Sequence, residues 1–296
     1  MKKEHLSKSE LVLTPDKSIY HLHLKPDQIA DIVFLVGDPG RVQIMSSLFD
    51  SVEHRIENRE FVTHTGYYRK KRISVVSTGI GTDNIDIVVN ELDALVNIDF
   101  DTREVKKEKK SLKLIRIGTS GAMHAEIEPG SVIVSDISCG LDNLLHYYKG
   151  LHEISDTAMG DSFMKHMSWN KENSNPYFIH ASNDLVSLLN GKAFFHGITL
   201  SAPGFYAPQG RSLRMAIADP DYIEKVSSFR YNNLRINNFE MEGSALCGLS
   251  KILGHQAVTI CIALANRITG RFITEYQPMV KVLLQDVLDK ICSIDE

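Results

Sequence analysis

Three arginines and a threonine are the residues of this sequence best suited to binding an anion. Arg116 lies inside the apolar run from Leu112 to Thr119, where an unpaired guanidinium would be costly to remove from water. It should therefore meet either a buried carboxylate or a bound anion, and the spacing alone leaves both alternatives open. Arg41 and Arg59, with the Thr119 hydroxyl and the N–H groups of glycine turns, would complete a phosphate site through charge-assisted hydrogen bonds.

The motifs of several other chemistries are missing from the sequence. There is no G-x-x-x-x-G-K-[ST] phosphate loop, and the segment from Gly79 to Asn84 lacks the third glycine of a dinucleotide fingerprint. Neither H-E-x-x-H nor G-x-S-x-G occurs. The cysteines show no C-x-x-C spacing, so we expect free thiols in a reducing compartment. An anion site without a nucleophile or a metal suits a reaction in which phosphate itself attacks, and we expect no cofactor.

These residues follow apolar runs that alternate with segments of helical period, a pattern that predicts an α/β fold with a largely buried sheet. Ligands of such sheets bind at the carboxyl ends of the strands, where this sequence concentrates Gly, Arg, Thr and Glu. We expect strands within residues 31–37, 72–78, 112–119, 131–139, 195–203 and 257–266, and helices within 42–49, 85–95, 185–189, 242–253 and 279–291.

Composition excludes several classes of protein. The chain has 296 residues, of which 43% are hydrophobic and 24% charged, so it can bury a sizeable core. A net charge of -4 gives no support to nucleic-acid binding. The longest apolar run, at 257–265, is too short to span a membrane, and the first residues lack the apolar stretch of a signal peptide. We therefore expect a cytoplasmic protein with neither nucleic-acid nor membrane partners.

Two segments look peripheral to the chemistry. Residues 1–15 are polar, and we expect a mobile N-terminal tail followed by a single domain over 16–296. Residues 103–113 hold six basic and two acidic side chains, within a segment of about 101–113 that interrupts no apolar pattern. We interpret this segment as a solvated surface insertion.

Seven short motifs occur along the chain: VGDPGRV from Val36, NREF from Asn58, STGIG from Ser77, IRIGTSGA from Ile115, FYAPQGR from Phe205, NFEMEGSAL from Asn238 and ANR from Ala265. Their identity and order resemble the nucleoside phosphorylase family with the phosphorylase/hydrolase-like fold, and within it the uridine phosphorylases. The resemblance extends from about Tyr20 to Ile291. It implies a single-domain, three-layer α/β/α fold with a mixed central sheet. It also implies a pentosyltransferase that converts uridine and phosphate reversibly to uracil and ribose 1-phosphate, in pyrimidine nucleoside salvage.

The resemblance assigns phosphate binding to the residues that follow the predicted strands and to the REF arginine. These are Gly37, Arg41, Arg59, Arg116 and Thr119. For Arg116 it favours the anion over the carboxylate. It also places a monovalent cation between subunits near a glutamate that matches Glu60. Because residues 82–84 depart from the serine found in the bacterial enzymes, we expect no metal there.

The resemblance assigns the rest of the site to two groups. The ribose contacts are His21, Glu240, Met241 and Glu242, and the base contacts are Phe205, Gln209, Arg211 and Arg267. A carboxylate can accept hydrogen bonds from both ribose hydroxyls, and a glutamine amide complements the imide edge of uracil. Donors at the uracil oxygens would stabilise the charge that develops as the glycosidic bond breaks. His21 is implied to reach the 5′-hydroxyl in a neighbouring subunit, which requires a homodimer or a hexamer of dimers.

One departure concerns the base loop. The related loops read Phe-Tyr-Pro-Gly-Gln, whereas this chain has Ala207 and Pro208 before Gln209, so displacement of Gln209 is an expectation to check.

Three alternatives have distinguishing features. Purine nucleoside phosphorylases of the family carry an aspartate where this chain has Asn266, and they lack the Gln209–Arg211 pair. A catalytically silent nucleoside-binding protein would be expected to have lost part of the phosphate set, and here the set is complete. A nicotinamide oxidoreductase is disfavoured by the missing third glycine.

Overall fold

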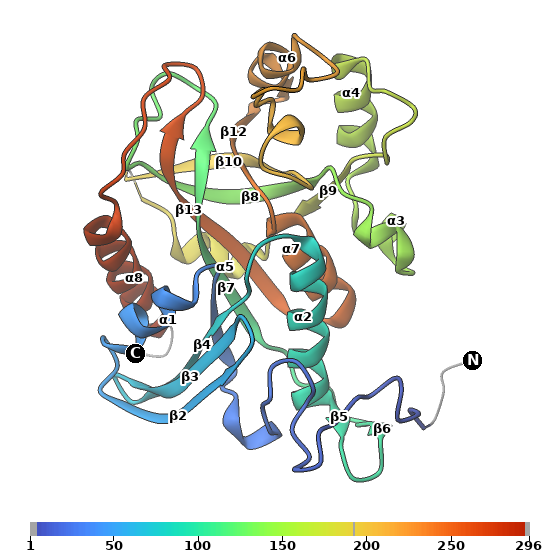
Figure 1. Cartoon of the computed structure of the whole chain (residues 1–296), viewed down its shortest axis with the longest axis vertical. Coiled ribbons are helices and arrows are strands. Elements are labelled where there is room, and N and C mark those ends of the chain that lie inside the picture. Colours follow the sequence, from blue (N-terminus) through green and yellow to red (C-terminus); the bar gives the residue numbers. More distant parts are fainter. Residues whose placement is uncertain (1–4, 192, 294–296) are drawn as a thin grey trace.

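A mixed sheet forms the centre of the molecule (Figure 1). The computed structural model describes residues 5–191 and 193–293. Ten strands run in the order β11-β12-β10-β8-β13-β7-β1-β4-β3-β2, and β9 joins the edge of β8. The strands are β1 Ile32–Val36, β2 Ser51–Asn58, β3 Phe61–Tyr68, β4 Lys71–Ser77, β7 Lys113–Ala122, β8 Val132–Gly140, β9 Tyr177–His180, β10 Phe194–Ser201, β11 Arg230–Tyr231, β12 Leu234–Glu240 and β13 Gln256–Asn266; β5 Ile98–Asp99 and β6 Glu104–Val105 form a separate pair.

Helices lie on both sides of the central strands. On one side α2 packs against α7, which itself covers β13 and β8; on the other, α1 and α5 both contact α8 (Figure 1). The helices are α1 Pro39–Ser46, α2 Thr82–Asn97, α3 Leu151–Ile154, α4 Thr157–Met167, α5 Asn183–Leu188, α6 Tyr222–Ser228, α7 Gly243–Leu253 and α8 Gln277–Cys292, with short 3-10 turns η1 Pro26–Gln28, η2 Leu144–Tyr147 and η3 Ala207–Gln209. The predicted α/β fold with a mixed central sheet is confirmed.

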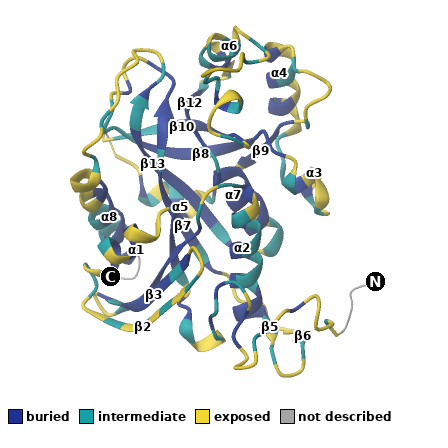
Figure 2. Cartoon of the chain, in the orientation of Figure 1, coloured by how far each residue is buried: buried dark blue, intermediate teal, exposed yellow. Residues whose placement is uncertain are grey.

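The central strands form because their apolar runs are buried on both faces, as Figure 2 shows for β7 and β13. β1 pairs in parallel with β4 and with β7, and β7 pairs in parallel with β13. In this register Val36 lies opposite both Ser77 and Ile117. The carboxyl ends of β1 and β4 therefore meet at the middle of β7, and this edge of the sheet positions the glycine turns.

The N-terminal segment, predicted as a mobile tail, makes specific contacts within the structure. Leu11 is buried, and Leu13 forms a bridge with Ile19. The guanidinium of Arg103 donates to the carbonyl oxygens of Leu6 at 2.9 Å and Ser7 at 2.8 Å, and to that of Leu11. Residues 5–15 are therefore packed against the basic segment through this arginine, while residues 1–4 lie outside the described residues and the mobility of the tail stays a prediction.

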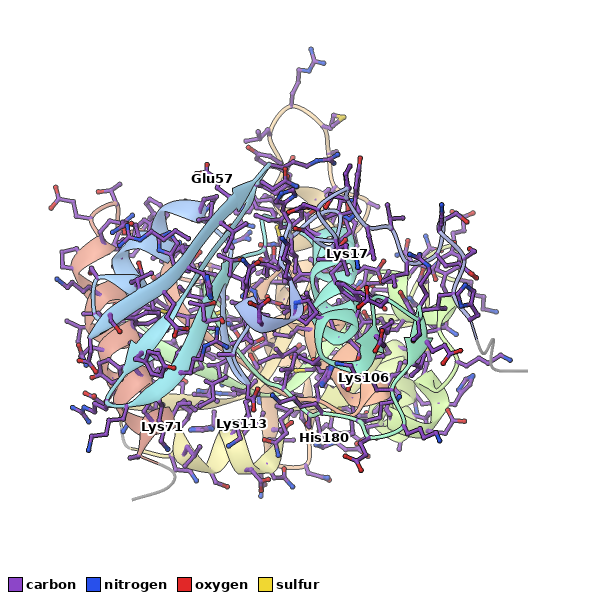
Figure 3. All side chains as sticks on the ribbon, turned by 90° about the horizontal axis from the view of Figure 1, so that it is seen from below. Lys17, Glu57, Lys71, Lys106, Lys113 and His180 are labelled. Atoms are coloured by element: carbon purple, nitrogen blue, oxygen red, sulfur yellow. The ribbon has the colours of Figure 1, made fainter. Side chains whose placement is uncertain are left out.

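The basic segment itself lies on the surface, as expected, around the exposed β5–β6 pair (Figure 2). Figure 3 shows Lys17 and Lys106 on the same side of the molecule, beside α2. Lys17 pairs with Asp101 at 2.5 Å, and Lys106 donates to the carbonyl of Val96 at 3.0 Å. Among the helices that the structure describes, none has the length and apolar character needed to cross a membrane.

Candidate active site

The turn between β1 and α1 holds a buried cation. Asp38 caps α1 by accepting from the Gly40 N–H at 2.9 Å, which sets Arg41 in the first turn of the helix. Arg41 is only 7% exposed, its guanidinium carbon lies 5.9 Å from the centre of the Tyr276 ring, and its Nε has no hydrogen-bond partner. No carboxylate within the described part of the chain pairs with it. Because an unpaired buried charge is strongly unfavourable, this position is suited to an anion.

Gly37 lies beside this cation and joins the turn to its neighbour. Its carbonyl accepts from the Gly79 N–H at 3.1 Å, so the turns after β1 and β4 lie against each other. Two residues further along the same turn, Gly81 donates its N–H to Glu242 Oε1 at 2.7 Å. Three segments far apart in the sequence therefore meet at the carboxyl ends of the strands.

Arg116 answers the question that the sequence left open. Its Nη2 donates to Glu242 Oε2, and its Nη1 lies 3.3 Å from Glu240 Oε2, with all three side chains at most 5% exposed. The guanidinium therefore meets buried carboxylates, and its predicted contact with an anion stays a prediction. Its Nε has no hydrogen-bond partner, so the two glutamates do not use all of its donors.

This cluster holds two carboxylates but only one guanidinium, so its acidic groups outnumber its basic group. Burial alone would lower the pKa of Arg116, but Glu242 and Glu240 outweigh it, and the pKa is raised. Burial raises the pKa of Glu242, and Glu240 adds to this effect while Arg116 opposes it. Arg116 therefore stays charged and holds Glu242 in place as an acceptor.

Glu240 is engaged within the protein. Its oxygens accept from the N–H groups of Glu242 and Gly243, each at 2.9 Å, and from the Ser201 hydroxyl. This carboxylate therefore closes the first turn of α7 and supports Arg116. Its oxygens are engaged and its side chain is only 1% exposed, so the structure shows a supporting role for Glu240, and its predicted contact with ribose stays a prediction.

A second cationic group lies at the base loop. Arg211 Nη1 donates to Gln209 Oε1 at 2.5 Å and to the Phe205 carbonyl at 2.7 Å, and its guanidinium carbon lies 3.9 Å from the centre of the Phe205 ring. Arg267 donates to the carbonyls of Gln209 at 2.8 Å and Gly210 at 3.2 Å. The structure thus brings all four predicted base contacts together. Gln209 is 2% exposed and lies beside Arg211, and its displacement relative to the related loops stays untested.

Neither arginine of this group has a carboxylate partner among the residues that the structure describes. Burial, together with the charge of the neighbouring Arg267, lowers the pKa of Arg211 to about 10. Burial also lowers the pKa of Arg267. Two adjacent guanidinium groups without a counter-ion suit a ligand whose oxygens gain negative charge during the reaction.

β7 connects the two halves of the site. A side chain at Gly118 would collide with Arg116, because its first carbon would lie 2.2 Å from Nη1. At Gly121 it would meet the side chain of Arg267 at 3.4 Å and that of Arg211 at 3.6 Å. Thr119 lies between these glycines with a partly exposed side chain. Gly118 therefore leaves room for the side chain of Arg116, and Gly121 leaves room for those of Arg211 and Arg267.

The partly exposed Met241 lies at the junction of β12 and α7, between the two engaged glutamates. Its predicted contact with the sugar stays a prediction.

His21 and Arg59 form a separate group at the surface. The exposed Arg59 donates to the Tyr20 hydroxyl at 3.4 Å, and the carbonyl of His21 accepts from Asn58 Nδ2 at 2.7 Å. His21 Nδ1 lies 2.6 Å from Glu91 Oε1. Within the described residues, no hydrogen bond or ion pair joins His21 or Arg59 to the Arg116 cluster. The structure therefore does not bring them into the same half of the site.

Three aromatic or acidic partners were missed by the sequence analysis. Tyr276 lies under Arg41, Tyr20 stacks against Arg59, and Glu91 holds His21. Tyr20 precedes His21 directly and could have been singled out on that ground. Tyr276 and Glu91 carry no motif, since their contacts arise only when distant elements pack. Glu60 belongs to no group of three or more metal-binding side chains among the described residues, and its cation stays untested.

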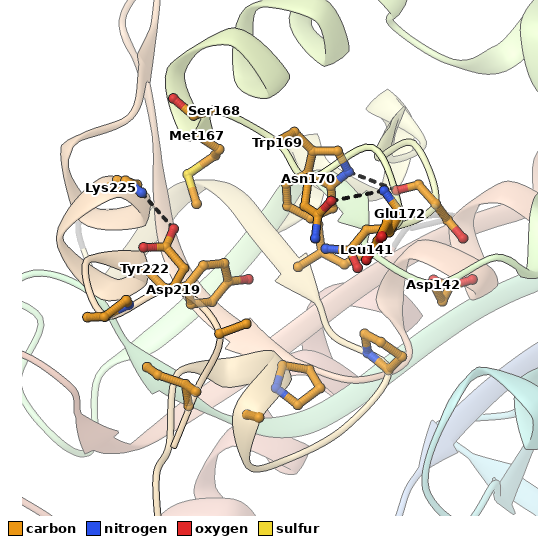
Figure 4. Close-up of a pocket in the computed structure, with 18 of the residues that line it drawn as sticks. Leu141, Asp142, Met167, Ser168, Trp169, Asn170, Glu172, Asp219, Tyr222 and Lys225 are labelled. Carbon is orange, nitrogen blue, oxygen red and sulfur yellow. Dashed lines mark hydrogen bonds and ion pairs between the residues drawn. The ribbon is translucent and has the colours of Figure 1, made fainter. Parts of the chain in front are cut away.

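A cavity of about 780 Å³ lies behind the base loop (Figure 4). Ala207 and Pro208 of that loop line it, and Figure 4 shows Trp169, Met167 and Tyr222 around it. None of the predicted site residues lines it. The two cationic groups described above therefore lie outside this cavity.

Comparison with known proteins gives consistent matches along the chain. The family model described as the phosphorylase superfamily matches residues 31–290. A uridine phosphorylase from Thermococcus kodakarensis is 32% identical over 275 residues, which cover 91% of this chain and 85% of that protein. The solved structure of a Trypanosoma brucei nucleoside phosphorylase, described as showing uridine phosphorylase activity, is 27% identical with a TM-score of 0.83, and the match covers 96% of this chain and 99% of that one. A DeoD-type purine nucleoside phosphorylase from Alkaliphilus metalliredigens is 37% identical, but over 39% of this chain and 44% of that protein.

Proposed function

The chain belongs to the phosphorylase superfamily, and we propose that it is a pentosyltransferase that catalyses the reversible phosphorolysis of uridine to uracil and ribose 1-phosphate. The observation that carries this proposal is a pair of cationic groups to which the described residues supply no carboxylate partner: the buried Arg41, and the partly buried Arg211 with Arg267. A nucleophilic anion and an anionic leaving group need such separate cationic sites. We place the reaction in pyrimidine nucleoside salvage in the cytoplasm, without a cofactor.

The reaction follows from this arrangement. Phosphate, held by Arg41, the Gly37 turn, Thr119 and the remaining donor of Arg116, forms a bond from one oxygen to C1′ of the ribose. The bond from C1′ to N1 of uracil breaks, and its electron pair leaves with the base. Gln209, Arg211 and Arg267 stabilise the negative charge on the uracil oxygens, and the base then takes up a proton.

Glu242 is the proposed ribose ligand. Its two oxygens are held by the Gly81 N–H and by Arg116, which fixes the carboxylate before substrate arrives. Each oxygen can accept a second hydrogen bond, and the 2′ and 3′ hydroxyls of ribose supply two donors. Because the carboxylate is already held in place, no free energy is spent on orienting it when the nucleoside binds, and this lowers the barrier to reaction.

The surface group of His21 and Arg59 supports a homo-oligomer. Glu91, which holds His21, is ten residues along α2 from Gly81, which contacts Glu242. At 1.5 Å per residue the two positions are about 15 Å apart along the helix. We therefore propose that His21 and Arg59 complete the site of a second copy, at its 5′-hydroxyl and its phosphate, in a dimer or a hexamer of dimers.

The proposed function is tested by following uracil release from uridine with and without phosphate. We expect turnover only when phosphate is present, and uridine to be a better substrate than inosine. Deoxyuridine, thymidine and adenosine complete the panel. Uracil release that does not depend on phosphate would indicate a hydrolase, and faster turnover of inosine would indicate a purine enzyme.

Asn266 argues against the purine alternative. Its amide nitrogen donates to the carbonyls of His124 at 2.8 Å and Ile127 at 2.9 Å, while its oxygen accepts from the N–H groups of Ile268 and Thr269 at 2.9 and 2.8 Å. The side chain is 1% exposed and has no capacity left for a purine nitrogen. It instead shapes the turn that carries Arg267.

We predict that Asn266→Asp does not create inosine phosphorolysis. The aspartate loses both donors, leaves the buried Ile127 carbonyl unpaired and removes one of the two donors to the His124 carbonyl, so uridine turnover should fall about tenfold and stability by about 2 kcal/mol. Initial rates with both nucleosides and the melting temperature measure these effects. A gain of inosine turnover in a stable variant would contradict the structural role given to Asn266.

We predict that Gln209→Ala and Arg211→Ala each lower kcat/KM for uridine about 100-fold, because each removes a donor aimed at the developing charge on uracil. Inosine turnover, whatever its basal level, should change much less. Arg271→Ala is a matched control, since that arginine is 57% exposed on the adjacent loop and pairs with Glu128 at the surface. Equal losses of kcat/KM for uridine and inosine would show that Gln209 and Arg211 do not recognise the uracil base.

A further inference from the structure

Glu91 is a carboxylate on α2 whose hydrogen bonds all converge on one neighbouring turn. Its oxygens accept from the backbone N–H of His21 at 3.1 Å and from that of Leu22 at 2.8 Å, and Oε1 lies 2.6 Å from His21 Nδ1. The Glu91 side chain is 13% exposed and that of His21 is 29% exposed. The more buried carboxylate of Glu91 therefore binds both the more exposed imidazole of His21 and the backbone N–H groups next to it.

This contact decides which nitrogen of His21 can serve a ligand. A carboxylate only accepts hydrogen bonds, so Nδ1 must carry a proton toward Glu91, and the neutral ring then presents Nε2 as an acceptor. A carboxylate that fixes the tautomer and orientation of a histidine is a known device of enzyme sites. The hydroxyl of a sugar is a donor that matches an accepting Nε2.

The surroundings of His21 limit its movement from other directions. The Tyr20 ring packs edge-on at 4.9 Å between centroids, Phe61 packs at 6.5 Å, and Asn58 Nδ2 donates to the His21 carbonyl at 2.7 Å. Among the residues that the structure describes, Glu91 is the hydrogen-bond partner of the ring nitrogens. The neighbours hold the turn, and Glu91 sets the state of the imidazole.

We propose that Glu91 is a positioning residue that fixes the Nδ1–H tautomer of His21, so that Nε2 accepts a hydrogen bond from the 5′-hydroxyl of the nucleoside. The proposal rests on the proposed function for the identity of the ligand, and on the geometry alone for the tautomer.

The kinetic test compares uridine with 5′-deoxyuridine, which lacks the hydroxyl. In Glu91→Gln the amide oxygen stays on the backbone N–H of Leu22, which turns the amide N–H toward Nδ1 and favours the other tautomer. We expect KM for uridine to rise about tenfold with kcat within a factor of two, which is the loss of one hydrogen bond. KM for 5′-deoxyuridine should change less than twofold. Asp93→Asn, the same loss of charge two residues along α2, is the matched control and should leave both values unchanged.

A double-variant cycle separates positioning from general damage. In the His21→Ala background, adding Glu91→Gln should cause no further rise in KM for uridine, because the residue through which Glu91 acts is gone. An equal rise in KM for both nucleosides, or a loss that persists without His21, would overturn the proposal.

The tautomer itself is measured without any turnover. In protein labelled with 15N-histidine, the His21 resonances, identified by their absence in His21→Ala, should report a protonated Nδ1 in the native protein and a protonated Nε2 in Glu91→Gln. Identical spectra would overturn the proposal even if uridine is the substrate. Conversely, failure of the native protein to cleave uridine would contradict the proposed function and leave this spectroscopic result to decide the role of Glu91.

Discussion

Arg116→Met is expected to lower kcat/KM for uridine phosphorolysis by at least about 1,000-fold, the largest loss of any single substitution in this site. The change removes a donor to phosphate and also the partner that holds Glu242 for ribose. It leaves two buried carboxylates without a positive charge, and breaking a buried pair in this way costs about 3–5 kcal/mol. We therefore expect a melting temperature lower by about 10 °C. Steady-state kinetics and thermal unfolding measure the two effects.

Arg116→Lys keeps the result interpretable if the methionine variant does not fold. Lysine retains the charge but cannot bridge two carboxylates and an anion, so we expect a loss of about 100-fold with a much smaller change in stability. Near-native activity of the lysine variant would show that the charge suffices and that the bridging geometry has no catalytic role.

Arg41→Ala is expected to raise KM for phosphate by about 100-fold or more, because this buried guanidinium has no other counter-ion among the described residues. Its effect on stability should be opposite to that of Arg116. Without phosphate, removing an unpaired buried charge should leave the melting temperature unchanged or higher. With phosphate, the native protein should gain stability by ligand binding and the variant should not.

Thermal unfolding across a phosphate titration measures this contrast directly. Arg55→Ala, which removes an exposed arginine from β2, is the control and should keep the full phosphate response. A variant at Arg41 that is destabilised without phosphate yet still responds to it would show that Arg41 is structural.

The fold and family could be predicted because their signals are local. Apolar runs predict β1, β7 and β13, and the spacing of Ile85, Val88, Leu92 and Leu95 predicts α2, all of which are buried. Short motifs that contact one ligand keep their residues next to each other in sequence. β2 and β3 were missed, since β2 alternates between exposed and partly exposed residues and lacks the apolar run of a central strand.

The partners within the site could not be predicted, because they depend on tertiary packing. The Gly81 and Glu242 contact joins residues 161 apart, and nothing in either motif indicates the other. For the same reason the sequence left Arg116 between a carboxylate and an anion, and only the packed structure shows its two carboxylate partners. The packing of residues 5–15 depends on Arg103, in a segment that otherwise looked like solvated surface.

α2 makes two of the contacts described above, one with Glu242 through Gly81 and one with His21 through Glu91. If His21 serves a second copy, helix α2 contributes to two active sites and positions residues that bind the sugar in both. Engineering of sugar specificity in this scaffold then has a constraint. A substitution that shifts α2 would move the residues that bind the 2′ and 3′ hydroxyls in its own site and the histidine that binds the 5′-hydroxyl in the neighbouring site. Recognition of these two parts of the nucleoside therefore cannot be changed independently through this helix.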